Sequence, residues 1–173
     1  MHYLRFITVA ADRMSWGLGG LGKVAIVAML ILVAGDVFYR YALSSPLLFG
    51  EEIAGYLAAA VGFLGAAETL RQRRHVRIEF LLNAVSGKWR GWLDVATHLI
   101  GVIALVVFFW HSSVFFDRVF TRGTVAPSIL ATPLWIPQTT MLIGMTAFLF
   151  QLVVDTAHAI GRALGRNIDR PQL

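Results

Sequence analysis

Residues 91–116, GWLDVATHLIGVIALVVFFWHSSVFF, form a nearly uncharged run that is long enough to cross a membrane as one helix. A spanning helix needs about 20 mostly apolar residues. Three further segments meet this requirement, at residues 18–40, 52–71 and 134–160. Pro137 falls in the first turn of the last segment, where proline is tolerated. We therefore predict an all-α integral membrane protein, with four transmembrane helices in a single domain over residues 1–173.

The composition of the whole chain agrees with this prediction. Of its 173 residues, 57% are hydrophobic and only 14% are charged, whereas about a quarter of the residues in soluble domains are charged. The net charge of +5 would suit nucleic acid, but the basic residues lie between apolar runs, where a membrane surface is the more natural partner. The chain has no cysteine, which excludes disulfides and cysteine-ligated metals. We expect the lipid bilayer as a partner and no nucleic acid.

The distribution of positive charge predicts the orientation. With four spans, both termini lie on the same side of the membrane, together with the segment between the second and third spans. That side holds twelve of the fifteen lysines and arginines, and the opposite side holds Arg40, Arg118 and Arg122. Positive residues concentrate on the cytoplasmic side. We therefore expect cytoplasmic N- and C-termini in a bacterial inner membrane.

The segment between the second and third spans has an amphipathic pattern. Apolar residues recur there at helical spacing: Ile78, Leu81, Leu82, Val85 and Trp89. The segment is too short to span, so residues 76–86 are predicted to form a helix in the cytoplasmic interface. Packing of this segment on a partner or on its own bundle is the alternative. The stretch from Tyr3 to Met14 is a weaker candidate for an interfacial helix.

Acidic residues gather at the opposite side of the membrane. Asp36 and Arg40 are four residues apart and can pair on one helix face. Glu51 and Glu52 stand at the start of the second span, where the helix dipole favours negative charge. The dipole alone accounts for both glutamates, but Arg40, Glu51 and Glu52 are equally candidates for docking a partner.

The second span carries a stripe of small residues. Its members fall within about a third of the helical wheel: Gly55, Ala58, Ala59, Gly62, Gly65 and Ala66. Leu57, Val61 and Leu64 lie opposite. Small residues let another backbone come close, which is how helices associate in lipid. The stripe is therefore a candidate subunit interface, with packing inside its own bundle as the alternative.

The predicted spans contain few residues that could catalyse a reaction, conduct an ion or bind a cofactor. We expect almost no ionisable residue between the helix ends, whereas ion and proton pathways normally contain such residues. His98 and His111 lie on roughly opposite faces of one helix, and His158 is the remaining helical histidine that could complete a bis-histidine haem site. We predict no catalytic, cofactor-binding or metal site. A b-type cytochrome or the membrane anchor of a redox complex remains an alternative, as does a small transporter that acts alone.

Several fragments of the sequence, in their order and spacing, carry a family resemblance. They are Arg40-Tyr41, Glu51-Glu52, Gly65-Ala66-Ala67, the run from Arg71 to Val76 that leads to Leu81-Leu82, and then Ser128 and Pro133-Leu134-Trp135. With these fragments the chain resembles the small membrane subunit, or Q-subunit, of tripartite ATP-independent periplasmic (TRAP) transporters. The chain departs from the family pattern before the paired glutamates, where Leu48 and Phe49 replace an expected tryptophan, and at Arg74, Glu79, Gln138 and Leu142.

The resemblance implies a non-catalytic subunit of a three-part secondary transporter. In such systems a periplasmic solute-binding protein delivers an organic anion, such as a carboxylate or sialic acid. A large M-subunit then performs sodium-coupled transport. The Q-subunit would brace the large subunit and help to dock the binding protein, with no cofactor of its own.

Overall fold

The computed structural model describes residues 2–45, 47–72 and 88–164, and it consists of four helices. They are α1 (His2–Ala42), α2 (Gly50–Arg71), α4 (Lys88–Arg122) and α5 (Trp135–Ala163). Each is long and apolar enough to cross a membrane. The predicted fold class, an all-α protein with four transmembrane helices, is therefore confirmed. The predicted interfacial helix, with Ile78, Leu81, Leu82 and Val85, lies outside the described residues, and Trp89 falls in the first turn of α4.

Two of the helices are much longer than the apolar runs that predicted them. Helix α1 has 41 residues and α4 has 35, which at 1.5 Å per residue makes them roughly 60 and 50 Å long. The hydrocarbon core of a bilayer is about 30 Å thick. The stretch from Tyr3 to Met14 continues the first span and does not form a separate interfacial helix, because no proline or loop residue interrupts it.

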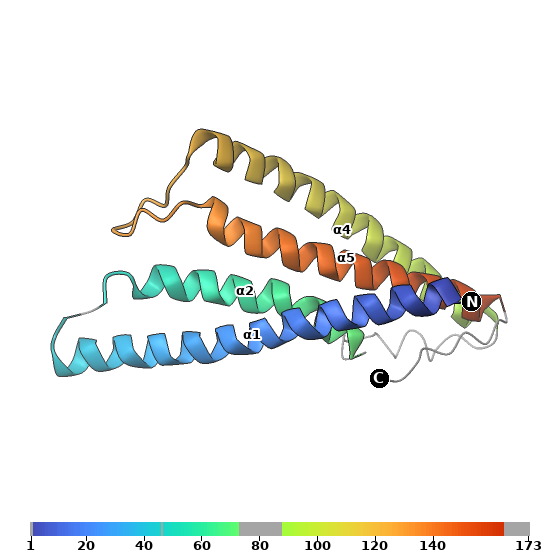
Figure 1. Cartoon of the computed structure of the whole chain (residues 1–173), viewed down its shortest axis with the longest axis horizontal. Coiled ribbons are helices and arrows are strands. Elements are labelled where there is room, and N and C mark those ends of the chain that lie inside the picture. Colours follow the sequence, from blue (N-terminus) through green and yellow to red (C-terminus); the bar gives the residue numbers. More distant parts are fainter. Residues whose placement is uncertain (1, 46, 73–87, 165–173) are drawn as a thin grey trace.

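The helices form a fan around α5. Helix α5 packs against α1, α2 and α4, and α1 also packs against α2, whereas α4 contacts α5 alone among the described helices. All four lie close together where α1 begins and α5 ends, which we call the terminal end (Figure 1). They diverge toward the hairpin end, where residues 43–49 join α1 to α2 and residues 123–134 join α4 to α5 (Figure 1).

The core of the fan runs along α5. Met145, Ala147 and Gln151 are almost fully buried there. Gly144 lets α2 approach closely, since a Cβ atom at this position would overlap the backbone carbonyl of Phe63. Backbone contact through small residues supplies the dispersion energy that holds helices together in lipid. The core of the chain is therefore the junction of α5 with α2 and α1.

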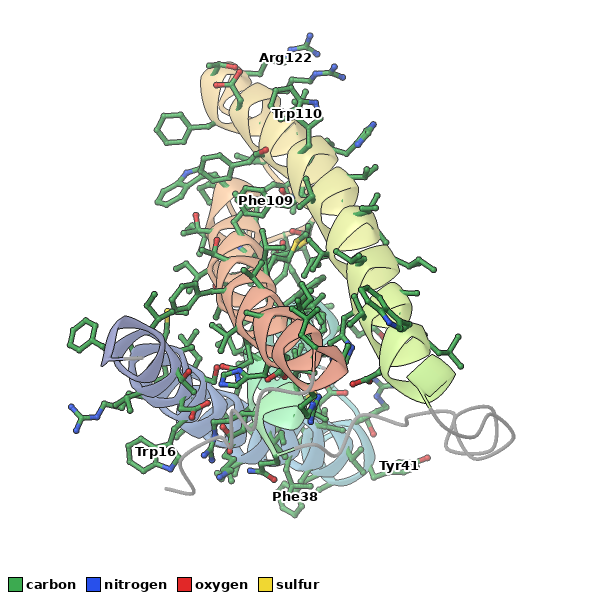
Figure 2. The ribbon with its side chains drawn as sticks, turned by 90° about the vertical axis from the view of Figure 1, so that its right-hand side faces the viewer. Trp16, Phe38, Tyr41, Phe109, Trp110 and Arg122 are labelled. Atoms are coloured by element: carbon green, nitrogen blue, oxygen red, sulfur yellow. The ribbon has the colours of Figure 1, made fainter. Side chains whose placement is uncertain are left out.

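The outer faces of the fan are apolar. On α4, Ile100 and Ile103 are 67% and 62% exposed, and Figure 2 shows Trp16, Phe38 and Tyr41 pointing away from the neighbouring helices. Such faces are stable only against lipid or another apolar surface. The arrangement therefore fits a chain embedded in a bilayer, with further helix faces available to a partner.

Candidate functional site

The small-residue stripe on α2 is exposed along part of its length. Gly55, Ala58 and Gly62 are exposed, and Ala59, Gly65 and Ala66 are half-buried. A Cβ atom added at Gly55, Gly62 or Gly65 would meet no other atom within 4 Å. The bundle thus makes no close contact through Gly55 and Gly62, in contrast to Gly144 in its core. Helix α1 does approach Gly65, because a Cβ atom at Gly22 would lie 3.6 Å from the Gly65 backbone nitrogen.

The opposite side of α2 faces the core of the chain. Its buried residues include Leu64, Ala67 and Leu70. Leu64 lies opposite the stripe, as the sequence pattern predicts. This leucine is only 7% exposed, so its side chain packs inside the bundle. A change at Leu64 therefore reports on the stability of the chain and not only on association.

The stripe continues into a groove between α1 and α2. The groove encloses about 560 Å³ and is lined by glycines from both helices, Gly19 and Gly22 from α1 and Gly62 and Gly65 from α2. Glycine in a helix interior is less favourable than alanine by about 1 kcal/mol. Outward-facing glycines such as Gly62 therefore weaken the helix without any packing gain inside this chain.

At the hairpin end, Asp36 organises the turn between α1 and α2. Its carboxylate accepts a hydrogen bond from Arg40 Nη2 at 2.8 Å, so the predicted pair is confirmed. The other carboxylate oxygen accepts a hydrogen bond from the Leu47 backbone N–H, also at 2.8 Å. Gly50 packs beside this carboxylate, and a Cβ atom there would lie in ordinary van der Waals contact with Asp36 Cγ, at 3.5 Å. Both carboxylate oxygens of Asp36 therefore accept hydrogen bonds from within the chain.

The two glutamates at the start of α2 differ in their surroundings. Glu51 is exposed and lines an open depression of about 340 Å³ with Arg40, Leu47 and Leu48. Glu52 is half-buried and accepts a hydrogen bond from the Tyr56 hydroxyl at 2.8 Å. Arg40 and Glu51 are therefore accessible to a partner, whereas Glu52 faces into the chain.

A buried polar cluster joins α1 to α5 near the terminal end, and the sequence pattern did not indicate it. Gln151 Nε2 donates a hydrogen bond to Asp12 Oδ1, and Ser15 Oγ donates one to Gln151 Oε1, both at 3.2 Å. Ser15 and Gln151 are fully buried, and Asp12 is 5% exposed. Because polar groups have no water to bind in lipid, this cluster fixes the register of α1 on α5.

These residues correct one expectation from the sequence. Ionisable groups are present between the helix ends, since Asp12 and Asp155 are both buried and Asp155 lies within the predicted span 134–160. Asp12 was not predicted to lie within a span, because it precedes the predicted first span. Gln151, a polar residue inside an otherwise apolar span, is the signal that could have indicated the cluster.

Further ion pairs lie at the terminal end. Arg71 Nε donates to Glu68 Oε2 at 2.6 Å, and the two residues are three apart on α2. Arg162 at the end of α5 pairs with Asp94 of α4 at 3.1 Å. The second pair ties α4 to α5 where the two helices come together.

Three histidines of α4 and α5 contact their own helix backbones. Nδ1 of His98, His111 and His158 lies 2.7 to 2.8 Å from the carbonyl oxygen four residues earlier. Within residues 2–45, 47–72 and 88–164, no three His, Cys, Asp or Glu side chains are grouped so that they could hold a metal ion. The described geometry thus gives each histidine a local role in its own helix.

Comparison with known proteins places the chain in a family. Residues 29–162 match the family described as "Tripartite ATP-independent periplasmic transporters, DctQ component". The chain is also similar to the sialic acid TRAP transporter permease protein SiaT of Haemophilus influenzae (strain 86-028NP). The two are 33% identical over 97 residues, which are 56% of this chain and only 15% of that relative. The family match and the four membrane-spanning helices lead to one conclusion: this multi-pass membrane protein belongs to the DctQ component family of TRAP transporters.

Proposed function

We propose that this chain is the small permease subunit of a TRAP-type secondary transporter, and that it braces a large membrane subunit through the stripe on α2. The observation that carries the proposal is the outward position of Gly55 and Gly62, which have open space where a neighbouring helix would fit. The relative supports it, because the region similar to this chain is a small part of one longer permease chain there. The role of the chain is structural and not catalytic.

The experiment that tests the brace is co-purification. A tagged copy of this chain, expressed with the neighbouring membrane genes and extracted in mild detergent, should retain a large multi-span protein. Stoichiometric recovery of that protein supports the proposal. Recovery of the chain alone, under conditions where both proteins are present in the membrane, would contradict it.

The orientation forms part of the proposal. The terminal end, with both termini and the predicted interfacial segment at 76–86, lies on the cytoplasmic side of the bacterial inner membrane. The hairpin end faces the periplasm. The positive-inside rule supports this assignment. A fluorescent-protein fusion after Leu173 should fluoresce, whereas a periplasmic phosphatase fused at the same place should stay inactive; the reverse pattern would invert the assignment.

The proposal also includes docking of a periplasmic solute-binding protein at the hairpin end. Arg40 and Glu51 are the accessible charges there, on either side of the depression that Leu47 and Leu48 complete. Glu52 contributes indirectly because it is turned into the chain. Exposed charges of both signs at an interface raise the rate at which two partners associate more than they raise the affinity.

The transported solute follows from the family and not from this chain. We propose ion-coupled uptake of an organic anion, such as a carboxylate or sialic acid, with sodium as the coupling ion; the name of the similar permease supports sialic acid as the first solute to test. Uptake by proteoliposomes that contain this chain with its large subunit, supplied with the solute-binding protein, should require a sodium gradient. Uptake by liposomes that contain this chain alone would contradict a bracing role.

A further inference from the structure

The loop that joins α4 to α5, residues 123–134, is held in one conformation by its own backbone. The Ala126 N–H donates to the Thr132 carbonyl at 2.9 Å, and the Leu134 N–H donates to the Thr124 carbonyl at 3.1 Å. Ala131 has a φ of 46°, which a residue other than glycine adopts only where its surroundings impose it. The loop is therefore a defined hairpin-like structure.

The tip of this loop presents large apolar side chains. Ile129 is 73% exposed and Leu130 is 44% exposed, although Ala126 behind them is buried. Figure 1 shows the loop projecting beyond the ends of α4 and α5 at the hairpin end. An ordered loop that holds isoleucine and leucine outward is typical of a contact surface.

The charges that precede the loop place it outside the hydrocarbon core. Asp117, Arg118 and Arg122 are all exposed in the last two turns of α4, and Figure 2 shows Arg122 at the end of that helix. Exposed charges avoid the apolar part of a bilayer. The apolar tip thus follows a charged zone and lies on the aqueous side of it. A protein partner with an apolar patch and an acidic rim would match the tip and its two arginines.

Glu52 connects this loop to α2. Its carboxylate accepts the hydrogen bond from Tyr56, and the hydroxyl groups of Ser128 and Thr132 from the loop lie close to the same carboxylate. The second carboxylate oxygen, Oε2, is buried and accepts no hydrogen bond from the described residues within ordinary geometry. A carboxylate in such a position favours a fixed loop, because moving the hydroxyls away would leave it less satisfied.

We infer that Glu52 is a positioning residue that fixes the α4–α5 loop on α2, and that Ile129 and Leu130 at the tip are an apolar contact for the periplasmic solute-binding protein. This inference rests on the proposed function. It adds the α4–α5 loop to the docking surface, which already includes Arg40 and Glu51. Glu52 acts through the loop and does not itself touch the partner.

The contact is tested with the assembled complex in proteoliposomes, by measuring uptake as the concentration of purified binding protein is varied. The double variant Ile129→Ser with Leu130→Ser should need about 10-fold more binding protein for half-maximal uptake, since apolar anchors at an interface center typically carry an effect of this size. The maximal rate and the co-purification of the large subunit should not change. Leu164→Ser is the matched control, because Leu164 is 61% exposed at the other end of the chain.

The positioning role is tested by the motion of the loop. The chain has no cysteine, so a spin label at a single introduced cysteine, Ile129→Cys, reports the loop alone. Glu52→Ala should increase the mobility of that label and shift the half-saturating concentration of binding protein in the same direction as the tip variant. Glu52→Gln should recover part of both effects, because its amide oxygen can still accept a hydrogen bond from the hydroxyl groups of the loop.

The outcomes separate the inference from the proposed function. If the tip variant behaves like the parent while Arg40→Ala or Glu51→Gln shifts the half-saturation, docking uses the other loop and the inference fails alone. If Glu52→Ala leaves the label mobility unchanged, the positioning role fails. If the parent complex shows no dependence on binding protein, or the large subunit does not co-purify, the proposed function fails together with the inference.

Discussion

Single polar residues decide how this chain is held together. In the apolar part of a bilayer every polar group must find a partner inside the protein, and Gln151 provides one for both Asp12 and Ser15. Asp36 has the same role at the other end, where it binds both Arg40 and the backbone of the α1–α2 turn. The Gln151 contacts join α1 to α5 and so add a polar register to the apolar packing, whereas the Asp36 contacts fix the end of α1 and the turn that follows it.

A substitution at Gln151 tests this role. Gln151→Leu keeps a side chain of similar size but leaves buried Asp12 without this hydrogen bond, which we expect to destabilise the chain by about 1–3 kcal/mol. Thermal unfolding in detergent should show a clear fall in Tm. Thr146→Val on the same helix is the control, because Thr146 is exposed and bonds only to the carbonyl of Leu142 in its own helix. Equal melting of the two variants would show that the buried cluster contributes nothing.

Among the helices, α2 has two faces with different roles. Leu64, Ala67 and Leu70 pack into the bundle, whereas Gly55 and Gly62 leave open space on the other side. The periodicity of the sequence predicted the division between small and bulky residues. It could not decide which side the chain uses for itself, because a small-residue face packs equally well on its own bundle or on a partner. In the structure, Gly55 and Gly62 have open space within this chain, which supports the proposal of a partner on that side.

The two faces of α2 should respond differently to substitution. Gly62→Leu adds bulk where the chain has none, so we expect normal insertion and an unchanged Tm of the isolated subunit. Its association with the large subunit should weaken by about 1–3 kcal/mol, the usual effect of overpacking. Leu64→Ala removes a buried side chain, so it should lower the Tm, with a loss of about 2–5 kcal/mol. Melting curves and co-purification of both variants check this; a lower Tm for Gly62→Leu would mean that the stripe supports the bundle.

At the scale of the whole molecule, the sequence predicted the four spans, and the structure shows how unequally they pack. Helix α5 contacts all three others, while α4 contacts α5 alone among the described helices. Apolar runs locate spans because transfer into lipid depends on composition. Such runs say little about helix ends in water or about buried polar pairs between distant segments. For that reason the extension of α1 to His2 and the contact of Asp12 with Gln151 were not predicted.

The open packing of the four helices leaves a large surface that a partner can cover. A bundle whose outer helix rests on one neighbour, with apolar faces outward on α1 and α4, has a large surface for lipid and for a second protein. The stripe on α2 is the part of that surface with room for close backbone approach. We therefore expect this face, and not the exposed side of α4, to meet the large subunit.

The most direct test uses the absence of native cysteine. Ala58→Cys places a single thiol on the exposed stripe, and Ile103→Cys places one on the exposed side of α4. Each variant is assembled with the large subunit in membranes and treated with a short photoactivated crosslinker attached to the thiol. We predict a crosslinked band with the large subunit from Ala58→Cys and only lipid adducts from Ile103→Cys. A band from Ile103→Cys with none from Ala58→Cys would contradict this prediction.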